Sequence, residues 1–98
     1  MESQMLELKG LADLRQYVYE TLCHHHDLVV GAFPLSERIL VRGGKPCGMY
    51  FCLHGPRSVR LTAIWETDRN SVLFYGPTGE KLSRTQLAPI AALTPVAA

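Results

Sequence analysis

Cysteine and histidine side chains, which can ligate a metal or act as nucleophile and base, occur at two places in this 98-residue sequence. The first is a run at 23–26, and the second lies between residues 47 and 54; together they comprise Cys23, His24, His25, His26, Cys47, Cys52 and His54. Zinc takes about four nitrogen or sulfur ligands in a tetrahedral array. Cys23 and His26 would share one side of a helix, and Cys52 and His54 one side of a strand, so four ligands are available in principle.

Two features of the sequence argue against a metal centre. The spacing of these residues matches no standard zinc module. Apolar and polar residues alternate along residues 47–66, as in a β-strand with one buried face. This alternation places Cys52 and His54 on the side of the sheet that is not covered by the helix bearing Cys23. We therefore expect no bound metal or other cofactor.

A thiol enzyme is a second hypothesis for Cys52 and His54. Arg60 would lie opposite Cys52 and could lower the pKa of its thiol, and Glu66 or Asp68 could orient the histidine. However, side chains two apart on a strand have Cα atoms about 6 to 7 Å apart, and no nucleophile elbow or Gly-rich phosphate loop is present. The sequence favours a protein that is not an enzyme, with a thiol or metal site at Cys52 and His54 as the alternative.

A β-hairpin over residues 47–66 positions these side chains. Apolar residues alternate with polar ones on both sides of the turn Gly55-Pro56-Arg57, which is typical of strands buried on one face. A three-residue loop pairs Leu53 with Val59, Phe51 with Leu61, and Met49 with Ala63, and makes one face wholly apolar. We expect the core to contain Phe51, Leu53, Val59, Leu61 and Trp65 together with Leu14, Val18 and Leu22.

The remaining elements are one helix and further strands. The three- and four-residue spacing of Leu11, Leu14, Val18 and Leu22 predicts an amphipathic helix over residues 9–26, with Gly10 as N-cap. Residues 28–33 are read as a connector or a short edge strand, and residues 37–42 and 71–75 as strands. A bulged turn at residues 76–79 would place Leu82 opposite Phe74. The predicted fold is α+β, with the N-terminal helix on one face of a four- to five-stranded antiparallel meander.

Bulk properties set the domain organisation and the compartment. We expect a single domain over residues 1–86 and a flexible or partner-packing tail over residues 87–98, which carries two prolines and no charge. The formal net charge is +1, and no apolar stretch reaches the roughly 20 residues of a membrane helix. The acidic start MESQMLELKG does not resemble a secretory signal, so we expect a cytoplasmic protein with three reduced cysteines.

One helix can cover only one face of such a sheet, so the other side, here called the open face, is the candidate binding surface. We expect it to carry Tyr50, Cys52, His54, Arg60, Thr62 and Ile64, with either Leu73 or Tyr75. An apolar and aromatic patch on a small domain is typical of a protein contact, most commonly a homodimer. Nucleic-acid binding by the tyrosines and arginines of the sheet is a further alternative.

Overall fold

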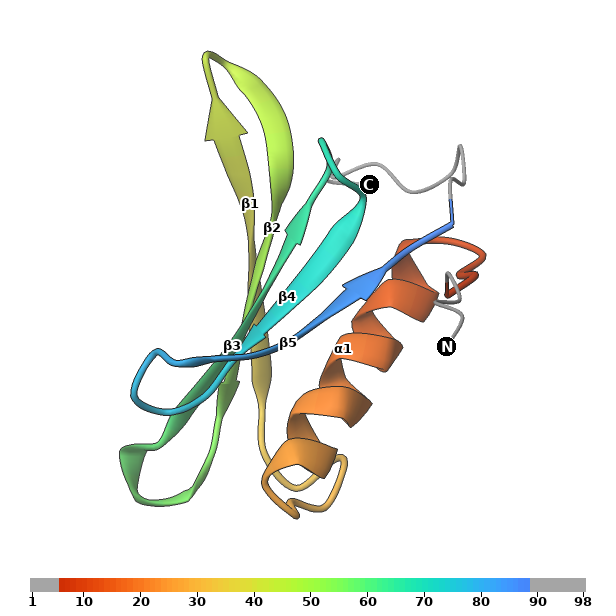
Figure 1. The fold of residues 1–98 in the computed structure, drawn as a ribbon. Helices are drawn as coiled ribbons and strands as arrows, with labels where there is room; N and C mark the ends of the chain where they lie inside the picture. Colours follow the sequence, from red (N-terminus) through yellow and green to blue (C-terminus); the bar gives the residue numbers. More distant parts are fainter. Residues whose placement is uncertain (1–5, 89–98) are drawn as a thin grey trace.

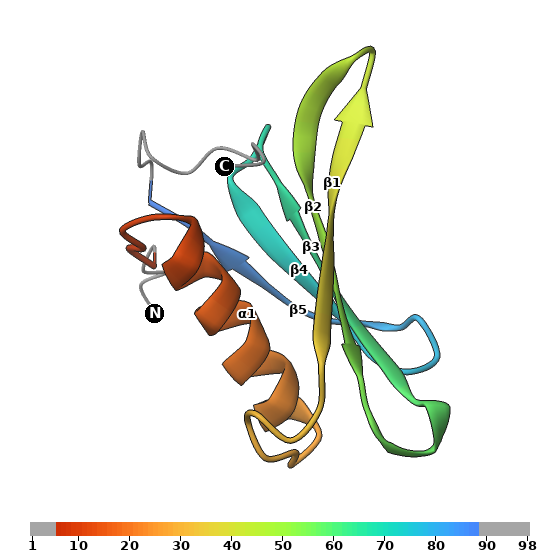
Figure 2. The ribbon, with the colours of Figure 1, turned by 180° about the vertical axis from the view of Figure 1, so that it is seen from behind.

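The computed structural model describes residues 6–88 and confirms the predicted α+β fold. One helix packs against one face of a five-stranded antiparallel sheet whose strand order follows the chain (Figure 1). The elements are α1 (Leu11–His25), β1 (Leu35–Arg42), β2 (Lys45–His54), the 3-10 turn η1 (Pro56–Ser58), β3 (Arg60–Glu66), β4 (Ser71–Tyr75) and β5 (Lys81–Gln86). The view from behind shows that α1 lies on one side only (Figure 2).

The helix begins and ends close to the predicted positions. Gly10 is its N-cap, and the Asp13 carboxylate accepts a hydrogen bond from the Lys9 backbone N–H at 3.0 Å. At the other end Asp27 has a positive φ of 55°, and the Leu28 N–H bonds to the Cys23 carbonyl at 2.8 Å. This is the Schellman arrangement, with Asp27 in the position that glycine usually takes.

Residues 28–33 form no strand, so of the two interpretations the connector holds. The Tyr19 hydroxyl donates to the Phe33 carbonyl and accepts from the Gly31 N–H at 3.1 Å. Leu28 and Phe33 pack against the core from this connector. It leads into β1, which starts at Leu35, two residues before the predicted strand.

The register of the central hairpin differs from the predicted one by two residues. Leu53 pairs with Leu61, Phe51 with Ala63, and Met49 with Trp65. The loop runs over five residues, because Arg57 and Ser58 adopt φ values of 58° and 64° and the Gly55 N–H bonds to the Val59 carbonyl at 2.8 Å. A shift of two leaves every side chain on its predicted face. The predicted apolar face is therefore correct, although its pairs are wrong.

The turn between β4 and β5 also differs from the prediction. Ser83, not Leu82, lies opposite Phe74, and Tyr75 pairs with Lys81. Leu82 is the extra residue of a bulge and is 41% exposed. The bulge turns the predicted partner of Phe74 out to solvent.

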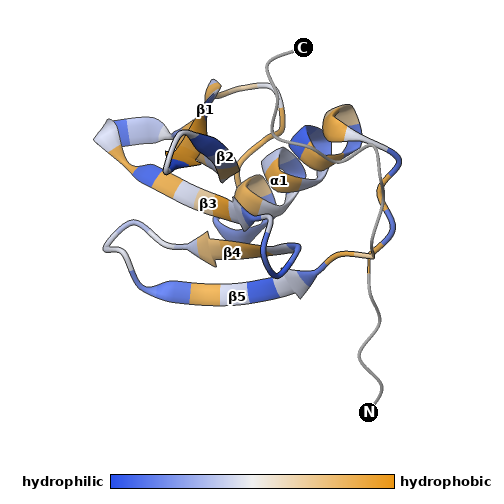
Figure 3. Ribbon diagram, turned by 90° about the horizontal axis from the view of Figure 1, so that it is seen from above, coloured by the Kyte–Doolittle hydropathy of each residue, from blue (hydrophilic) through white to orange (hydrophobic). Residues whose placement is uncertain are grey.

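The core lies between α1 and the sheet and contains the predicted residues, except that Val59 is only partly buried. Leu14, Val18 and Leu22 of α1 are fully buried against Phe51, Leu61 and Phe74 of the sheet face. The core also takes in Leu8, Cys23, Met49, Leu53, Ala63, Trp65, Val72 and Leu87. Coloured by hydropathy, β4 is mostly apolar and β5, at the sheet edge, is mostly polar (Figure 3).

The chain segments at both ends of the described region contact each other. Leu6 forms a parallel bridge with Leu87, which belongs to the predicted tail but is only 1% exposed. Asn70 anchors this end: its side-chain amide donates to the Leu87 and Ala88 carbonyls at 3.3 and 3.1 Å. The rest of the predicted tail, residues 89–98, lies outside the described residues.

Candidate functional site

The face of the sheet turned away from α1 is organised in rows that run across the strands. In the middle row Arg38 of β1 pairs with Tyr50, Tyr50 with Ile64, Ile64 with Leu73, and Leu73 with Arg84 of β5. Directly paired residues project from the same face of a sheet, so these five side chains lie side by side. We call them the central row: an apolar centre with one arginine at each edge of the sheet.

Two further rows flank the central row. On one side lie Ser36, Cys52, Thr62, Tyr75 and Lys81, and beyond them the pair of His54 and Arg60. On the other side lie Leu40, Gly48, Glu66, Ser71 and Gln86. The rows just described thus carry four basic side chains, Arg38, Arg60, Lys81 and Arg84, against the single acid Glu66.

The central row is separate from the hydrophobic core. Tyr50, Ile64 and Leu73 are half-buried, and none of them packs in the core cluster. The Arg38 guanidinium carbon lies 5.0 Å from the centroid of the Tyr50 ring, within cation–π distance. Burial and the neighbouring Cys52 raise the pKa of Tyr50, so its phenol stays neutral and can donate a hydrogen bond.

All six residues predicted for the open face lie on it, and the register also brings in residues that were not predicted. Tyr50, His54, Thr62 and Ile64 are half-buried and Arg60 is exposed, whereas Cys52 is only 4% exposed. Both Leu73 and Tyr75 belong to this face, although only one of the two was predicted there. Arg38 and Arg84 were missed, because their partners become known only once β1 and β5 are placed at the two edges.

The geometry around Cys52 differs from that of the thiol-enzyme hypothesis. Arg60 pairs with His54 and not with Cys52, which lies opposite Thr62. The His54 Nε2 atom instead shares a hydrogen bond of 2.9 Å with the Ser36 hydroxyl. Among residues 6–88 no carboxylate bonds to the other nitrogen of this ring, so nothing there orients it as a general base. A thiol that is nearly inaccessible gives a substrate no direct approach.

The two groups of possible metal ligands lie in different surroundings. Cys23 is buried in the core, where burial raises the pKa of its thiol. The His25 ring packs edge-on against Phe74 at 5.6 Å between ring centroids, on the helix side of the sheet. Cys52 and His54 lie on the open face. In the described part of the chain no three His, Cys, Asp or Glu side chains come together as a ligand set.

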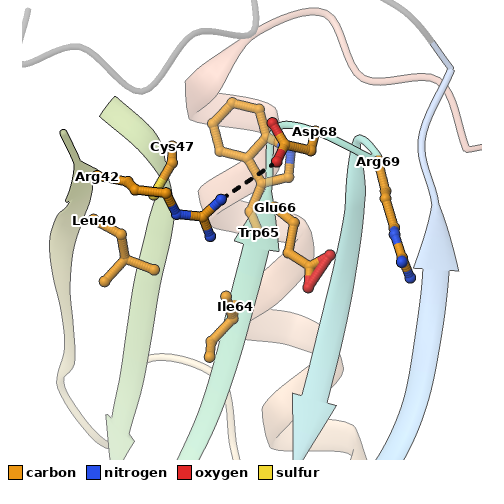
Figure 4. Close-up of a pocket in the computed structure, with 8 residues that line it drawn as sticks. All are labelled: Leu40, Arg42, Cys47, Ile64, Trp65, Glu66, Asp68 and Arg69. Atoms are coloured by element: carbon orange, nitrogen blue, oxygen red, sulfur yellow. Dashed lines mark ion pairs between the residues drawn. The ribbon is translucent and has the colours of Figure 1, made fainter. Parts of the chain in front are cut away.

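A hollow of about 350 Å³ lies at the end of the open face nearest the β1–β2 hairpin. Figure 4 shows the Arg42 guanidinium reaching from β1 toward Asp68, with 3.7 Å between the charged atoms. The hollow adjoins the central row at Ile64 and is lined by Leu40, Arg42, Cys47, Ile64, Trp65, Glu66, Asp68 and Arg69. Its two acids and two arginines give it no strong preference for one sign of charge.

Gly48 allows the strands beside this hollow to approach closely. A Cβ atom at this position would lie 2.2 Å from the Trp65 carbonyl oxygen, which is well inside van der Waals contact. Only glycine therefore fits at this position of β2, where its backbone lies close to that of β3 next to the hollow. Beyond this point the β1–β2 hairpin projects past the ends of the other strands (Figure 1).

Comparisons with models of protein families, with curated proteins and with solved structures found no match. Within residues 6–88, neither α1 nor η1 has the length and apolar character that a bilayer crossing requires.

Proposed function

We propose that this protein is a non-enzymatic binding module that holds a protein partner on the open face. The central row supports this proposal more than any other feature. Its middle is apolar across three adjacent strands, and its ends are the arginines of the two edge strands. Apolar surface that is left uncovered and bordered by polar groups is typical of an interaction site, and tyrosine and arginine are the residues that most often anchor one.

The charge of the open face favours a different protein over a second copy of this chain. In a two-fold dimer the same patch meets itself, so the basic side chains of one copy would face those of the other. Like charges brought together at an interface oppose association. A partner that carries acidic groups would neutralise them. The homodimer expected from the sequence is therefore the less favoured of the two protein partners.

We place the module in the cytoplasm. The cysteines at positions 23, 47 and 52 are free thiols, which is the form that a reducing compartment maintains.

Site-specific photo-crosslinking in the cells that produce the protein tests this proposal. A benzophenone amino acid replaces Leu73 on the open face, and in a matched version it replaces Gln16, which is exposed on α1. We expect the benzophenone at position 73 to form a covalent adduct with a different protein, and the one at position 16 to form none. Adducts from neither position, or equally from both, would contradict the proposal. An adduct of two identical chains would show a homodimer instead.

A further inference from the structure

The spacing of charge and apolar surface on the open face indicates the shape of its partner. Neighbouring strands are about 4.8 Å apart, so Tyr50, Ile64 and Leu73 span roughly 10 Å across β2, β3 and β4. An α-helix has a diameter of about 10 to 12 Å. A helix lying along the strands would thus cover these three residues, and its two flanks would lie over β1 and β5, where Arg38 and Arg84 are exposed.

From this match we propose that the open face binds an acidic amphipathic helix that crosses the central row, with its apolar stripe over Tyr50, Ile64 and Leu73 at the crossing and with Asp or Glu on both flanks. The inference rests on the proposed function and specifies its partner. The opposite face already binds a helix in this way, since Leu14, Val18 and Leu22 of α1 form an apolar stripe that is buried on the sheet. A second helix would complete a helix–sheet–helix sandwich.

The electrostatics match the same occupant. Lys81, like Arg84, lies on β5, and both are exposed, so one flank of the helix meets two positive charges. The other flank meets Arg38, whose guanidinium is already held over the Tyr50 ring. Residues 89–98 of this chain contain no acidic side chain, so the sequence of its own tail does not supply the complement.

A single-stranded nucleic acid fits the same face less well. Such ligands bind mainly by stacking bases on aromatic rings that present a free face. The middle of the central row is aliphatic, at Ile64 and Leu73, and Arg38 covers the Tyr50 ring. Tyr75 lies in the neighbouring row, so the two tyrosines do not form a continuous platform.

The test uses three fluorescent probes and the intact protein. Two are synthetic helical peptides of about 16 residues with the same Leu stripe, one flanked by Glu and the other by Lys. The third is an oligothymidine of about 20 nucleotides. We expect the Glu-flanked peptide to bind about tenfold or more tightly than the Lys-flanked one, with an affinity that falls as salt is added. Equal binding of both peptides, binding of neither, or tighter binding of the oligothymidine would overturn the inference.

Charge reversal assigns the binding to the two arginines. Arg38→Glu combined with Arg84→Glu should lower the affinity for the Glu-flanked peptide about tenfold and raise the affinity for the Lys-flanked one. The control Lys9→Glu, before α1, should change neither affinity. If the double reversal lowers the melting temperature, Arg38→Gln with Arg84→Gln gives the same comparison for the Glu-flanked peptide without added negative charge. Unchanged affinity in either double variant would contradict the proposal. A crosslinked partner at Leu73 without the preference for Glu flanks would leave the binding function standing and remove only the acidic helix.

Discussion

Arg38 and Tyr50 face each other across β1 and β2, with the guanidinium carbon of the arginine 5.0 Å from the centroid of the tyrosine ring. The contact favours one orientation of an exposed arginine at the edge of the sheet, above a half-buried aromatic ring. A side chain already held in place loses less conformational entropy when it binds a partner. The open face therefore presents at least one of its charges in a preferred orientation.

The core assignment is tested by shortening a fully buried side chain. Leu61→Ala should lower the free energy of unfolding by about 2 to 5 kcal/mol, because Leu61 is 0% exposed and its removal leaves a cavity. Val41→Ala is the control, since Val41 is 61% exposed and its loss should cost less than about 0.5 kcal/mol. Denaturant unfolding measures both values. Similar small effects at the two positions would mean that Leu61 is not part of the core.

Gly48→Ala tests the close approach of β2 and β3. The added Cβ would lie 2.2 Å from a backbone oxygen, so the strands must separate, at a cost of about 1 to 3 kcal/mol. Gly55→Ala serves as the matched control, because its Cβ would meet no atom closer than 3.5 Å. Thermal unfolding should show a clearly lower melting temperature for Gly48→Ala and an almost unchanged one for Gly55→Ala. Equal melting temperatures would refute the close contact.

The faces of the sheet were predictable from the sequence, whereas the register was not. The alternation of Met49, Phe51 and Leu53 places these residues on one face whatever the turn, because a strand repeats every two residues. The same property makes registers that differ by two residues indistinguishable by hydrophobicity alone. Only the positive φ values of Arg57 and Ser58 set the longer loop, and no glycine signals them in the sequence.

The candidate site was predictable in part for the same reason. The six residues predicted from alternation along β2 and β3 lie on the open face, but Arg38 and Arg84 are 46 residues apart in sequence and join the row only through three intervening strands. The contact of Ser36 with His54 likewise depends on the β1–β2 register. The apolar composition of the uncharged tail left packing on a partner open, but it did not predict that Leu87 would be buried within its own chain.

Protonation of His25 should destabilise the fold. Burial, followed by the charges of His26 and His24, lowers the pKa of His25 below its ordinary value of 6.5. The unfolded chain therefore binds this proton first, and the stabilisation is present above about pH 6.5 and is lost as the pH falls toward the lower folded pKa. When the pH is lowered from about 7.5 to 5.5, the melting temperature of His25→Gln should fall less than that of the wild type. His24→Gln, at an exposed position, removes only the smallest of the three causes and should keep most of the pH dependence of the wild type. Identical curves for the wild type and His25→Gln would contradict this role.

Chelators should leave the stability unchanged. The buried Cys23 and the open-face pair Cys52 and His54 lie on opposite sides of the sheet, so they cannot share one ion. Folds that depend on a metal lose structure when it is removed. Melting temperatures with and without EDTA should agree, and metal analysis of the purified protein should find less than one equivalent of zinc. A large loss in EDTA would show that a metal site was missed.

The central claim, that the open face binds a partner, is tested most directly by placing a charge in the middle of the central row. Ile64→Asp should keep the melting temperature close to that of the wild type, because Ile64 is half-buried and lies outside the core cluster. Buried against a partner, the same carboxylate would be desolvated without a counter-charge, at a cost of several kcal/mol. The measurement is the yield of the crosslinked adduct from position 73, with Val29→Asp, at a residue 72% exposed beyond α1, as control. We predict that Ile64→Asp abolishes the adduct and Val29→Asp retains it; an undiminished adduct in folded Ile64→Asp would contradict the claim.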